Sequence, residues 1–229
     1  MKLGIMQPYF FPYIGYFQLI KSVDKFVLYD DVNYIKQGWI NRNRLISNNA
    51  GSYFTLMLQG ASSFRKINEI QTGENKGKLL KTISQVYSKA PFFSSVLPMI
   101  ESVLVYPENN LSLYLENIIR NLCLFLRIPT ELFVSSRINK DASLKGAEKV
   151  IAICKQFNAK EYINPIGGQS LYGKDAFAKN GLELKFIQSR GMEYKQFDGG
   201  FVPGLSIIDV MMFNSPEEIW EMLKQYELI

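Results

Sequence analysis

The chain has 229 residues, of which 47% are hydrophobic and 14% aromatic, and it carries a formal net charge of +5. These values predict one folded domain, or one domain with a small appendage, and exclude a disordered chain. The sequence contains no histidine, which excludes histidine-based triads, imidazole proton shuttles and histidine metal sites. Any general base must therefore be a carboxylate, a lysine, a tyrosine, a thiol or the substrate itself.

Other features of the composition point to a cytoplasmic protein without a membrane span. No apolar run approaches the roughly 20 residues that cross a bilayer. The start of the chain does not follow the order of a signal peptide, because Gln7, Pro8 and Pro12 interrupt its apolar residues. Cys123 and Cys154 fall in apolar helical patterns, which predicts buried, unpaired thiols. The mild positive charge suits phosphorylated ligands, whereas a dedicated nucleic-acid binder would have dense Lys/Arg runs.

The first thirty residues predict a β-α-β unit. Residues 3–7 form a short apolar run that ends at Pro8, which cannot donate to a strand ladder. Residues 13–22 have helical spacing of their apolar positions, and residues 25–30 predict a second strand. Strand, helix and strand within about 30 residues indicate two parallel strands.

A hairpin and a helical section follow. Residues 43–47 and 53–58 flank Asn48-Asn49-Ala50-Gly51, whose Asn and Gly residues tolerate positive φ. Residues 60–75 are polar and predict irregular structure. The apolar stripes of the middle section predict core helices in preference to a cofactor site, and Pro98 starts or bends the second of them. These helices are expected at 76–89, 92–105 and 110–127.

The last hundred residues again alternate between strands and helices. We expect Asp141 or Ser143 to cap the first of these helices, Gly181 to end the second, and Ser215 to open the last with a capping box. The predicted strands are 131–135, 162–165 and 184–188, and the predicted helices are 143–157, 173–180, 205–213 and 216–227. The pattern predicts a single α/β domain over 1–229, with a mainly parallel sheet, β-α-β units at both ends and an inserted helical section at about 76–127.

Polar residues at predicted strand ends are the first candidates for a binding site, because open α/β sheets bind ligands outside the carboxyl ends of their strands. Gln7 follows the first strand, and Tyr13 and Tyr16 flank the start of the first helix. We interpret these three residues as ligand-binding, and the structural alternative is that the loop is simply fastened to the core.

Asp30 and Asp31 follow the second predicted strand. A carboxylate there can act as a base, bind an ammonium group or sugar hydroxyls, or hold Mg²⁺, although the metal role has weak support. Because adjacent side chains on a strand point to opposite faces, one aspartate could be catalytic and the other structural. A turn with a helix cap is the alternative for both.

Alternation along residues 39–44 places Asn41 on one face, and Arg42 and Arg44 on the other. Two arginines on one face suit a phosphate or a carboxylate, which a guanidinium grips bidentately. The alternative is a charged edge strand that prevents aggregation. Trp39 could stack on a ligand ring or pack on the core.

The C-terminal half adds Asn164, Gln196, Ser206 and Asp209 as candidates. Asn164 precedes a Gly-Gly pair that could bind an anion, and Ser206 could cap a helix. Gln196 and Asp209 flank a shaped Gly/Pro-rich loop, so either side chain could reach a site. We interpret Asp209 as a catalytic candidate and the other three as substrate-binding candidates.

At these residues the chain resembles the WbqC-like protein family. The resemblance implies functional roles for Gln7, Asp30 or Asp31, Asn41, Arg42, Ser206 and Asp209. The motifs that carry the likeness lie near both ends of the chain, so the likeness covers essentially all of it. They are Met6-Gln7-Pro8 with Phe11-Pro12 and Gly15-Tyr16-Phe17, Asp30-Asp31-Val32, Gly38-Trp39 with Asn41-Arg42-Asn43, and Phe201-Val202-Pro203 with Leu205-Ser206-Ile207-Ile208-Asp209.

The resemblance implies a role in O-antigen or other surface polysaccharide biosynthesis, since family members occur in such gene clusters. Some members are labelled glycine transferases, which implies transfer of an aminoacyl or acyl group to a nucleotide-linked amino sugar. The implied donor is an activated amino acid or acyl group. An aminoacyl-tRNA and a loaded carrier protein are two alternatives for the form of this donor. A nucleotide sugar is the expected ligand, and no further cofactor is identified.

Two other functions stay open. Residues 4–20 are similar in outline to a nucleotidylyltransferase signature, but its two histidines are absent, and Tyr16 stands near the place of one. A nucleotidyltransferase-like nucleotide-binding enzyme is therefore one alternative. A non-catalytic binding or scaffold protein of a polysaccharide assembly pathway is the other.

Overall fold

The computed structural model describes residues 1–229 and contains the predicted N-terminal β-α-β unit. Strand β1 (Lys2–Met6) leads through helix α1 (Ile14–Lys21) to the parallel strand β2 (Lys25–Leu28). Further along the chain, β7 (Glu131–Val134), β8 (Glu161–Pro165) and β9 (Glu183–Ser189) join the same sheet in parallel. The fold is therefore of the predicted α/β class with a mainly parallel sheet.

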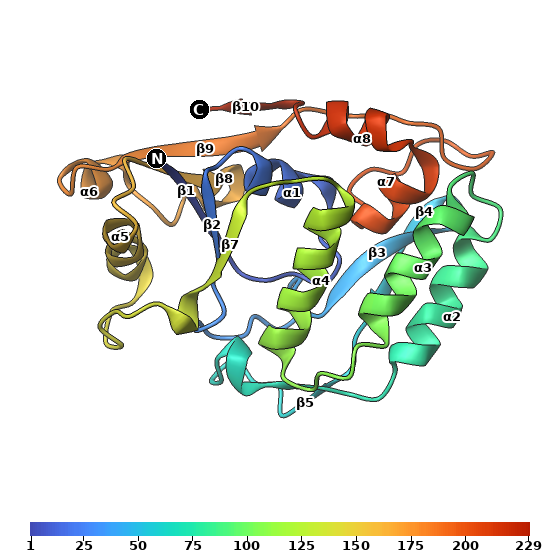
Figure 1. Ribbon diagram of the computed structural model, residues 1–229, viewed down its shortest axis with the longest axis horizontal. Helices are drawn as coiled ribbons and strands as arrows, with labels where there is room; N and C mark the ends of the chain where they lie inside the picture. Colours follow the sequence, from blue (N-terminus) through green and yellow to red (C-terminus); the bar gives the residue numbers. More distant parts are fainter.

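The order of the sheet is β10-β9-β8-β1-β2-β7 (Figure 1). The chain leaves β1 toward β2 and β7, and it then returns to the other side of β1 to form β8 and β9. This is the strand order of the doubly wound sheets that bind dinucleotides. The direction of winding reverses between β1 and β8, so a crevice is expected at the carboxyl ends of these two strands.

Helices cover both faces of the sheet. Helices α1 and α4 (Leu111–Phe125) pack on one face in a core of 46 buried residues, whereas α5 (Gly146–Gln156) and α6 (Lys174–Ala178) close a smaller core of 13 residues on the other. Figure 1 shows α5 and α6 on one side of the sheet and the helical section on the other. Both cysteines are buried and free, as predicted.

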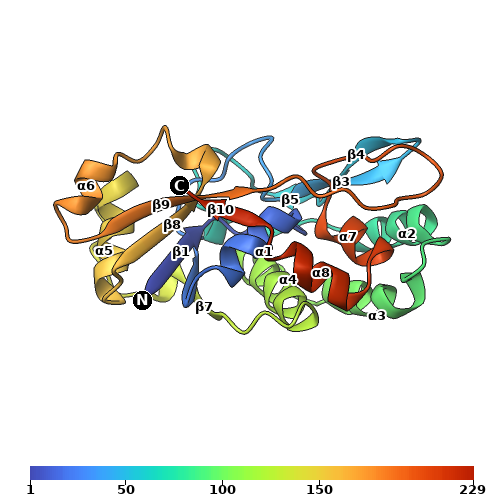
Figure 2. The ribbon, with the colours of Figure 1, turned by 90° about the horizontal axis from the view of Figure 1, so that it is seen from above.

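The helical section and the hairpin extend the larger core. Helices α2 (Lys76–Tyr87) and α3 (Phe93–Leu104) pack beside the hairpin of β3 (Arg42–Ser47) and β4 (Ala50–Thr55). In Figure 2 this hairpin extends beyond the sheet, at the end of the molecule opposite α5 and α6. Its turn has positive φ at Asn48 (49°) and Asn49 (58°), as the sequence predicts.

The remaining elements are short. Strands β5 (Leu58–Gln59) and β6 (Gln71–Thr72) pair within the mainly irregular segment predicted at 60–75. Turns of 3₁₀ helix occur at η1 (Ile67–Glu69), η2 (Ser135–Arg137) and η3 (Ile166–Gly168). Helix α7 (Ile207–Phe213) is capped by Ser206, and helix α8 (Pro216–Met222) opens with the predicted capping box of Ser215 and Glu218. No helix has the length and apolar character needed to span a bilayer.

Two sequence predictions about these elements are wrong, and a third is narrowed. The last helix ends at Met222, and β10 (Tyr226–Leu228) pairs antiparallel with β9, because the edge of β9 offers free ladder groups. Helix α5 begins at Gly146, whereas Asp141 accepts hydrogen bonds from Ser143 in a separate turn upstream. Of the two alternatives predicted for Pro98, the start of the helix is excluded, since Pro98 lies in the interior of α3, and the bend stays a prediction.

Candidate functional site

The crevice expected between β1 and β8 is present as a cavity of about 430 Å³, which we call the switch-point cavity. Its size lies within the range of small-molecule sites, roughly 300–1,000 Å³. The wall combines aromatic rings, two side-chain amides and glycine backbone. Its lining includes Gln7, Tyr9, Tyr29, Asn164, Gly167 and Gly168.

The two amides of the switch-point cavity have no partner in the protein. Asn164 is the last but one residue of β8 and is only 4% exposed. Gln7 is the first residue after β1. Neither side chain makes a hydrogen bond to another protein group, and neither amide is among the side-chain groups that are sealed from solvent without a partner, so both can bond to a ligand in the cavity. The sequence predicted both residues as ligand-binding, and the structure brings them together at one cavity.

Gly168 lets the Asn164 side chain lie against the backbone of η3. A Cβ atom added at Gly168 would meet Asn164 Nδ2 at 2.4 Å, whereas one added at Gly167 would meet nothing within 4 Å. A side chain at 168 must therefore displace the asparagine amide. Of the Gly-Gly pair, only Gly168 is needed to leave room for the Asn164 side chain, and anion binding by the pair stays a prediction.

Tyr16 lies behind the switch-point cavity and does not line it. Its hydroxyl donates to the carbonyl oxygen of Gln7 at 3.0 Å, and its ring lies 5.5 Å from that of Tyr9. Burial raises the pKa of Tyr16 well above its usual value and raises the pKa of Tyr9 to about 12. Both phenols are therefore neutral at pH 7, and Tyr16 holds the backbone of Gln7 in place.

Asp31 anchors two buried lysines beside the switch-point cavity. Its Oδ2 lies 3.0 Å from Lys140 Nζ and 2.9 Å from Lys149 Nζ, and its Oδ1 accepts a bond of 2.6 Å from Ser135 Oγ. Burial acts to raise the pKa of Asp31, but the bonds from Ser135, Lys149 and Lys140 outweigh it and lower this pKa. Lys149 Nζ also lies 5.1 Å from the ring centre of Tyr29, which lines the cavity.

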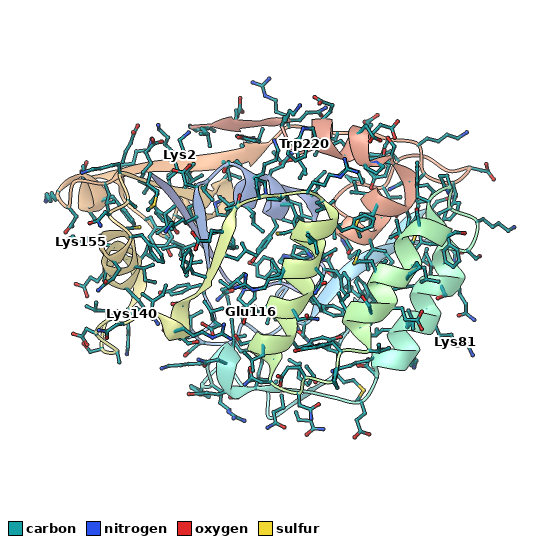
Figure 3. All side chains as sticks on the ribbon, viewed as in Figure 1. Lys2, Lys81, Glu116, Lys140, Lys155 and Trp220 are labelled. Atoms are coloured by element: carbon teal, nitrogen blue, oxygen red, sulfur yellow. The ribbon has the colours of Figure 1, made fainter.

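This cluster has a surplus positive charge, since two ammonium groups share one carboxylate. The two lysine side chains are only 6% and 8% exposed, so solvent screens them little. Figure 3 labels Lys140 close to α5 and the end of β7. A cation held there favours an anionic ligand in the neighbouring cavity.

Asp30 faces the opposite side of the sheet from Asp31, as alternation predicts. It is 1% exposed and accepts hydrogen bonds from Ser112 Oγ (2.8 Å), Ser136 Oγ (2.7 Å) and Ser136 N (2.9 Å). These bonds connect the end of β2 to α4 and to η2. The Asp30 carboxylate therefore bonds to other protein groups, and it does not line the switch-point cavity.

A second cavity, of about 700 Å³, lies beyond the end of β9, and we call it the aromatic cavity. Tyr13, which the sequence predicted as ligand-binding, lines this cavity together with Tyr194 and Phe201. Gln7 and Tyr13 therefore stand at different cavities. Of the loop between them, Tyr9 lines the switch-point cavity, and no residue from 8 to 12 lines the aromatic cavity.

Asp209 and Gln196 lie beneath the wall of the aromatic cavity. Asp209 is fully buried and accepts hydrogen bonds from Tyr194 Oη (2.7 Å), Gln196 Nε2 (2.8 Å) and Tyr87 Oη (2.8 Å). Burial raises the pKa of Asp209, and the bonds from Tyr194, Tyr87 and Gln196 act against this rise. Ser206 donates from Oγ to the carbonyl oxygen of Phe11 at 2.8 Å.

The hairpin residues make contacts within the protein. Asn41 bonds to Leu56 and Tyr34, and Arg44 donates to the carbonyl oxygens of Pro203 (3.3 Å) and Gly204 (2.9 Å). Alternation is confirmed, since Asn41 is buried and Arg42 and Arg44 are half-buried. None of these three side chains lines either cavity.

Arg42 and Trp39 form a small surface cluster with Tyr53. The Arg42 guanidinium lies 4.4 Å from the ring centre of Tyr53 and donates to the carbonyl oxygens of Gly38 and Gln37. Trp39 is 37% exposed, and its ring lies 6.2 Å from that of Tyr53. The polar groups of the first forty-four residues therefore divide between three places.

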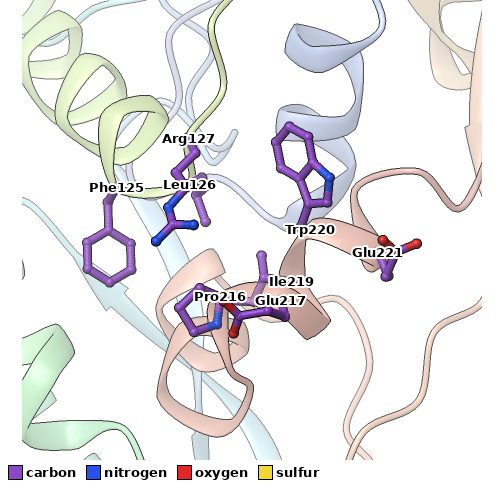
Figure 4. Close-up of a pocket in the computed structure, with 8 residues that line it drawn as sticks. All are labelled: Phe125, Leu126, Arg127, Pro216, Glu217, Ile219, Trp220 and Glu221. Atoms are coloured by element: carbon purple, nitrogen blue, oxygen red, sulfur yellow. The ribbon is translucent and has the colours of Figure 1, made fainter.

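A third cavity, of about 420 Å³, lies between the C-terminal end of α4 and α8 (Figure 4). Figure 4 shows Trp220 and Phe125 among its lining residues, with Arg127 between the two helices. No residue predicted from the sequence as functional lines this cavity. The cavity adjoins the end of α4, from which the chain runs to the beginning of β7, so it does not lie at the carboxyl ends of the parallel strands.

Sequence reasoning missed Lys140, Lys149, Tyr29 and Tyr194. The lysines lie more than 100 residues from Asp31 in the chain, so no local pattern joins them. Tyr29 directly follows β2 and could have been identified by its position alone. The cysteines are not candidates, because burial raises the pKa of each thiol to about 12.

Comparisons with known proteins identify the family. The chain is 29% identical to a Mycobacterium tuberculosis protein named "Uncharacterized protein Rv1507c" over 228 residues, which cover 97% of each chain. No solved structure matches the chain. Residues 7–221, almost the whole chain, match the WbqC-like protein family. The chain belongs to the WbqC-like protein family.

Proposed function

We propose that this protein is a transferase that binds a nucleotide-linked amino sugar in the switch-point cavity and transfers an aminoacyl or acyl group to the sugar amine. The observation that carries the proposal is the pair of unpartnered amides, Gln7 and Asn164, at the point where the sheet reverses its winding. Ligands of doubly wound sheets bind at this point. Amides there can recognise a nucleobase edge or sugar hydroxyls.

The charge beside the cavity supports a phosphorylated ligand. The two ammonium groups of Lys140 and Lys149 and the carboxylate of Asp31 carry a net charge of +1, and solvent screens this charge little. A pyrophosphate at the glycine backbone of η3 would lie on the same side of the sheet as these lysines. Tyr9, Tyr29 and Tyr172 offer rings on which a base or a sugar can stack.

The chemistry follows from the absence of histidine and from buried thiols. The sugar amine attacks the acyl carbon directly, the new C–N bond forms, and the bond from that carbon to its carrier breaks with the electron pair. The proton of the amine leaves to the displaced carrier group or to water. Asp31 is a weak base because its pKa is lowered, so we assign it the role of orienting the two lysines.

A second candidate, a non-catalytic binding protein for nucleotide sugars, is favoured by one observation. Asp30 accepts three hydrogen bonds and Asp31 is held by two lysines, which leaves no free carboxylate at the switch-point cavity. Binding without transfer needs only the amides, rings and lysines.

The binding part of the proposal is tested with a matched glycine pair. Titration calorimetry with UDP-glucosamine should give a Kd at least tenfold higher for Gly168→Ala than for the wild type, because the added Cβ displaces Asn164. Gly167→Ala should bind as the wild type does, since its Cβ meets nothing. Equal binding by both variants, or no binding by the wild type, would contradict a ligand site at this cavity.

The transferase part needs a product. Mass spectrometry of UDP-glucosamine incubated with protein and an activated glycine donor should show the mass of a glycyl group on the sugar. Binding with no product from glycyl-tRNA, glycyl-adenylate or a glycyl-loaded carrier protein would favour the non-catalytic candidate. Release of pyrophosphate from a nucleoside triphosphate and a sugar phosphate would instead indicate nucleotidyl transfer.

A further inference from the structure

We infer that the aromatic cavity is a second ligand site and that it binds a primary ammonium group. The inference rests on the proposed function, because a transferase must hold a donor as well as an acceptor. It deepens that proposal by naming the chemistry that the second cavity recognises. The cavity of about 700 Å³ is larger than the switch-point cavity and shares none of its lining residues.

Three aromatic rings line this cavity. Tyr194 and Phe201 contact each other edge to face, with ring centres 5.1 Å apart, and Tyr13 lines the same cavity and is 40% exposed. A cation within about 6 Å of such rings is attracted by their quadrupoles, and cages of this kind bind ammonium groups. Tyr13, Tyr194 and Phe201 thus supply what an ammonium ligand needs.

The lining also has one free carboxylate. Glu193 lines the cavity, is exposed, and has no ion pair or side-chain hydrogen bond to the rest of the protein. Arg190, the other charged lining residue, is already paired with Glu227 at 3.1 Å. The negative charge available to a ligand is therefore that of Glu193, which complements a ligand amine.

The wall behind the rings is rigid. Tyr194 donates to Asp209, which also accepts from Gln196 and Tyr87, so one buried carboxylate fixes the Tyr194 ring. Gln196 in turn accepts from the backbone N–H of Val202 at 2.8 Å, which ties down the segment that carries Phe201. A network with all its partners satisfied holds a binding surface in one conformation.

A short loop separates the two cavities. Gln7 and Tyr9 line the switch-point cavity, whereas Tyr13, six residues after Gln7, lines the aromatic cavity. Asn43 donates to the carbonyl oxygens of Phe10 (3.2 Å) and Phe11 (2.8 Å), and Ser206 also donates to Phe11. The loop is thus clamped from both sides and can hold two ligands at a fixed separation.

The ammonium group has two possible sources: an aminoacyl donor or the amino sugar itself. Glycinamide and D-glucosamine serve as probes for these sources, and N-acetylglycinamide and N-acetyl-D-glucosamine serve as their uncharged counterparts. Saturation-transfer NMR titrations give the Kd of each probe. We expect at least one amine probe to bind at least tenfold more tightly than its N-acetyl counterpart, and the better amine probe identifies the source.

Glu193→Gln should raise the Kd of that amine probe at least tenfold while leaving its N-acetyl counterpart unchanged, because the substitution removes the charge and keeps the shape. Glu101→Gln, an exposed glutamate of α3, is the matched control and should have no effect. Phe201→Leu should also weaken the amine probe, because it removes one ring. Circular dichroism confirms that each variant is folded.

Equal binding of amine and N-acetyl probes, or an unchanged Kd in Glu193→Gln, would overturn the inference. Its failure is distinguishable from failure of the proposed function, since UDP-glucosamine binding through Gly168 concerns the other cavity. Gln7→Ala supplies the cross-check: it should weaken UDP-glucosamine binding and leave the Kd of the better amine probe unchanged. Loss of both ligands in Gln7→Ala would mean that the two cavities act as one site.

Discussion

At the scale of single residues, the neighbours Asp30 and Asp31 have separate tasks. Alternation along the strand sends Asp30 toward α4 and Asp31 toward α5, so the pair cannot act together on one ligand. Asp30 fastens the end of β2 to two serines, whereas Asp31 balances two buried lysines. The pairing in the sequence therefore indicates proximity to a site, but it does not indicate a carboxylate dyad.

Asp31→Asn tests this role through stability. At pH 7 the substitution leaves the ammonium groups of Lys140 and Lys149 buried without a counter-charge, which should lower the free energy of unfolding by about 3–5 kcal/mol. The folded pKa of Asp31 is lowered, so its stabilising effect is fully present above the unfolded pKa of about 3.9 and is lost as pH falls through the folded pKa. Urea denaturation from pH 7 to pH 3 measures both quantities.

The gap between wild type and Asp31→Asn should stay constant above about pH 5 and narrow below about pH 4. Asp24→Asn, at an exposed residue whose carboxylate accepts one bond from the backbone of Lys2, is the control and should cost far less. A gap independent of pH down to pH 3 would mean that loss of packing, and not charge, explains the destabilisation.

Sequence reasoning proposed Gln7 because it follows a predicted strand, and Asn164 because it precedes a Gly-Gly pair that could bind an anion. Both residues lie near the carboxyl end of a parallel strand and line the switch-point cavity. Arg42 and Arg44 were also predicted as ligand-binding, yet both guanidinium groups donate to backbone carbonyls. A sequence states how many donors an arginine has, but the nearest acceptor depends on segments that are distant in the chain. For Arg44 that acceptor lies about 160 residues away.

At the scale of elements, most helices and strands follow local patterns, and the errors arise where a tertiary contact decides. The capping box at Ser215 and the turn at Asn48-Asn49 are local devices, and the structure confirms both. Strand β10 depends on the free edge of β9, which the residues 226–228 cannot reveal. Its sequence continues an amphipathic helix pattern that the chain does not follow.

Pro98 gives an element-scale prediction. It lies in the sixth position of α3, has no N–H, and so leaves the carbonyl oxygen of Ser94 without its intrahelical donor. Its ring is exposed, so Pro98→Ala should restore a hydrogen bond at little packing cost and increase the free energy of unfolding by about 1–3 kcal/mol. The midpoint of thermal unfolding should rise by about 2–4 °C per kcal/mol.

Ser94→Ala, at an exposed position of the same helix, controls for a general gain in helix propensity. Its effect should stay within about 0.5 kcal/mol. A destabilised Pro98→Ala variant would show that the proline holds a bend on which the packing of α3 against α4 depends.

At the scale of the whole molecule, the sheet separates two cores and the strand order places the switch-point cavity. The alternation of strands and helices gave the fold class, but it could not give the order β10-β9-β8-β1-β2-β7. Strands β1 and β8 pair although more than 150 residues separate them in the chain. Nothing in the sequence of either strand indicates which strand lies beside it. The position of the cavity depends on this order, and hence the site could be predicted only as a set of strand ends.

The larger core joins the hairpin, the helical section and one face of the sheet, and the sheet connects it to the smaller core. It includes Leu45 and Phe54 of the hairpin, Ile83 and Leu115 of the helical section, and Phe17 of α1, so no boundary of exposed residues separates these parts. We therefore predict a single cooperative transition in guanidinium chloride, with the same midpoint for every probe. The two tryptophans make this measurable, because Trp39 adjoins the hairpin and Trp220 lies on α8.

Fluorescence of Trp39→Phe reports unfolding near α8, and fluorescence of Trp220→Phe reports unfolding near the hairpin. Far-UV circular dichroism of each variant supplies the matched control, since it follows all helices and strands of the same protein. Coincidence of the fluorescence and dichroism midpoints within each variant supports one folding unit over residues 1–229. An earlier loss of Trp39 fluorescence would show instead that the hairpin unfolds on its own, and the clamp that Asn43 places on the loop between the two cavities would then open before the sheet does.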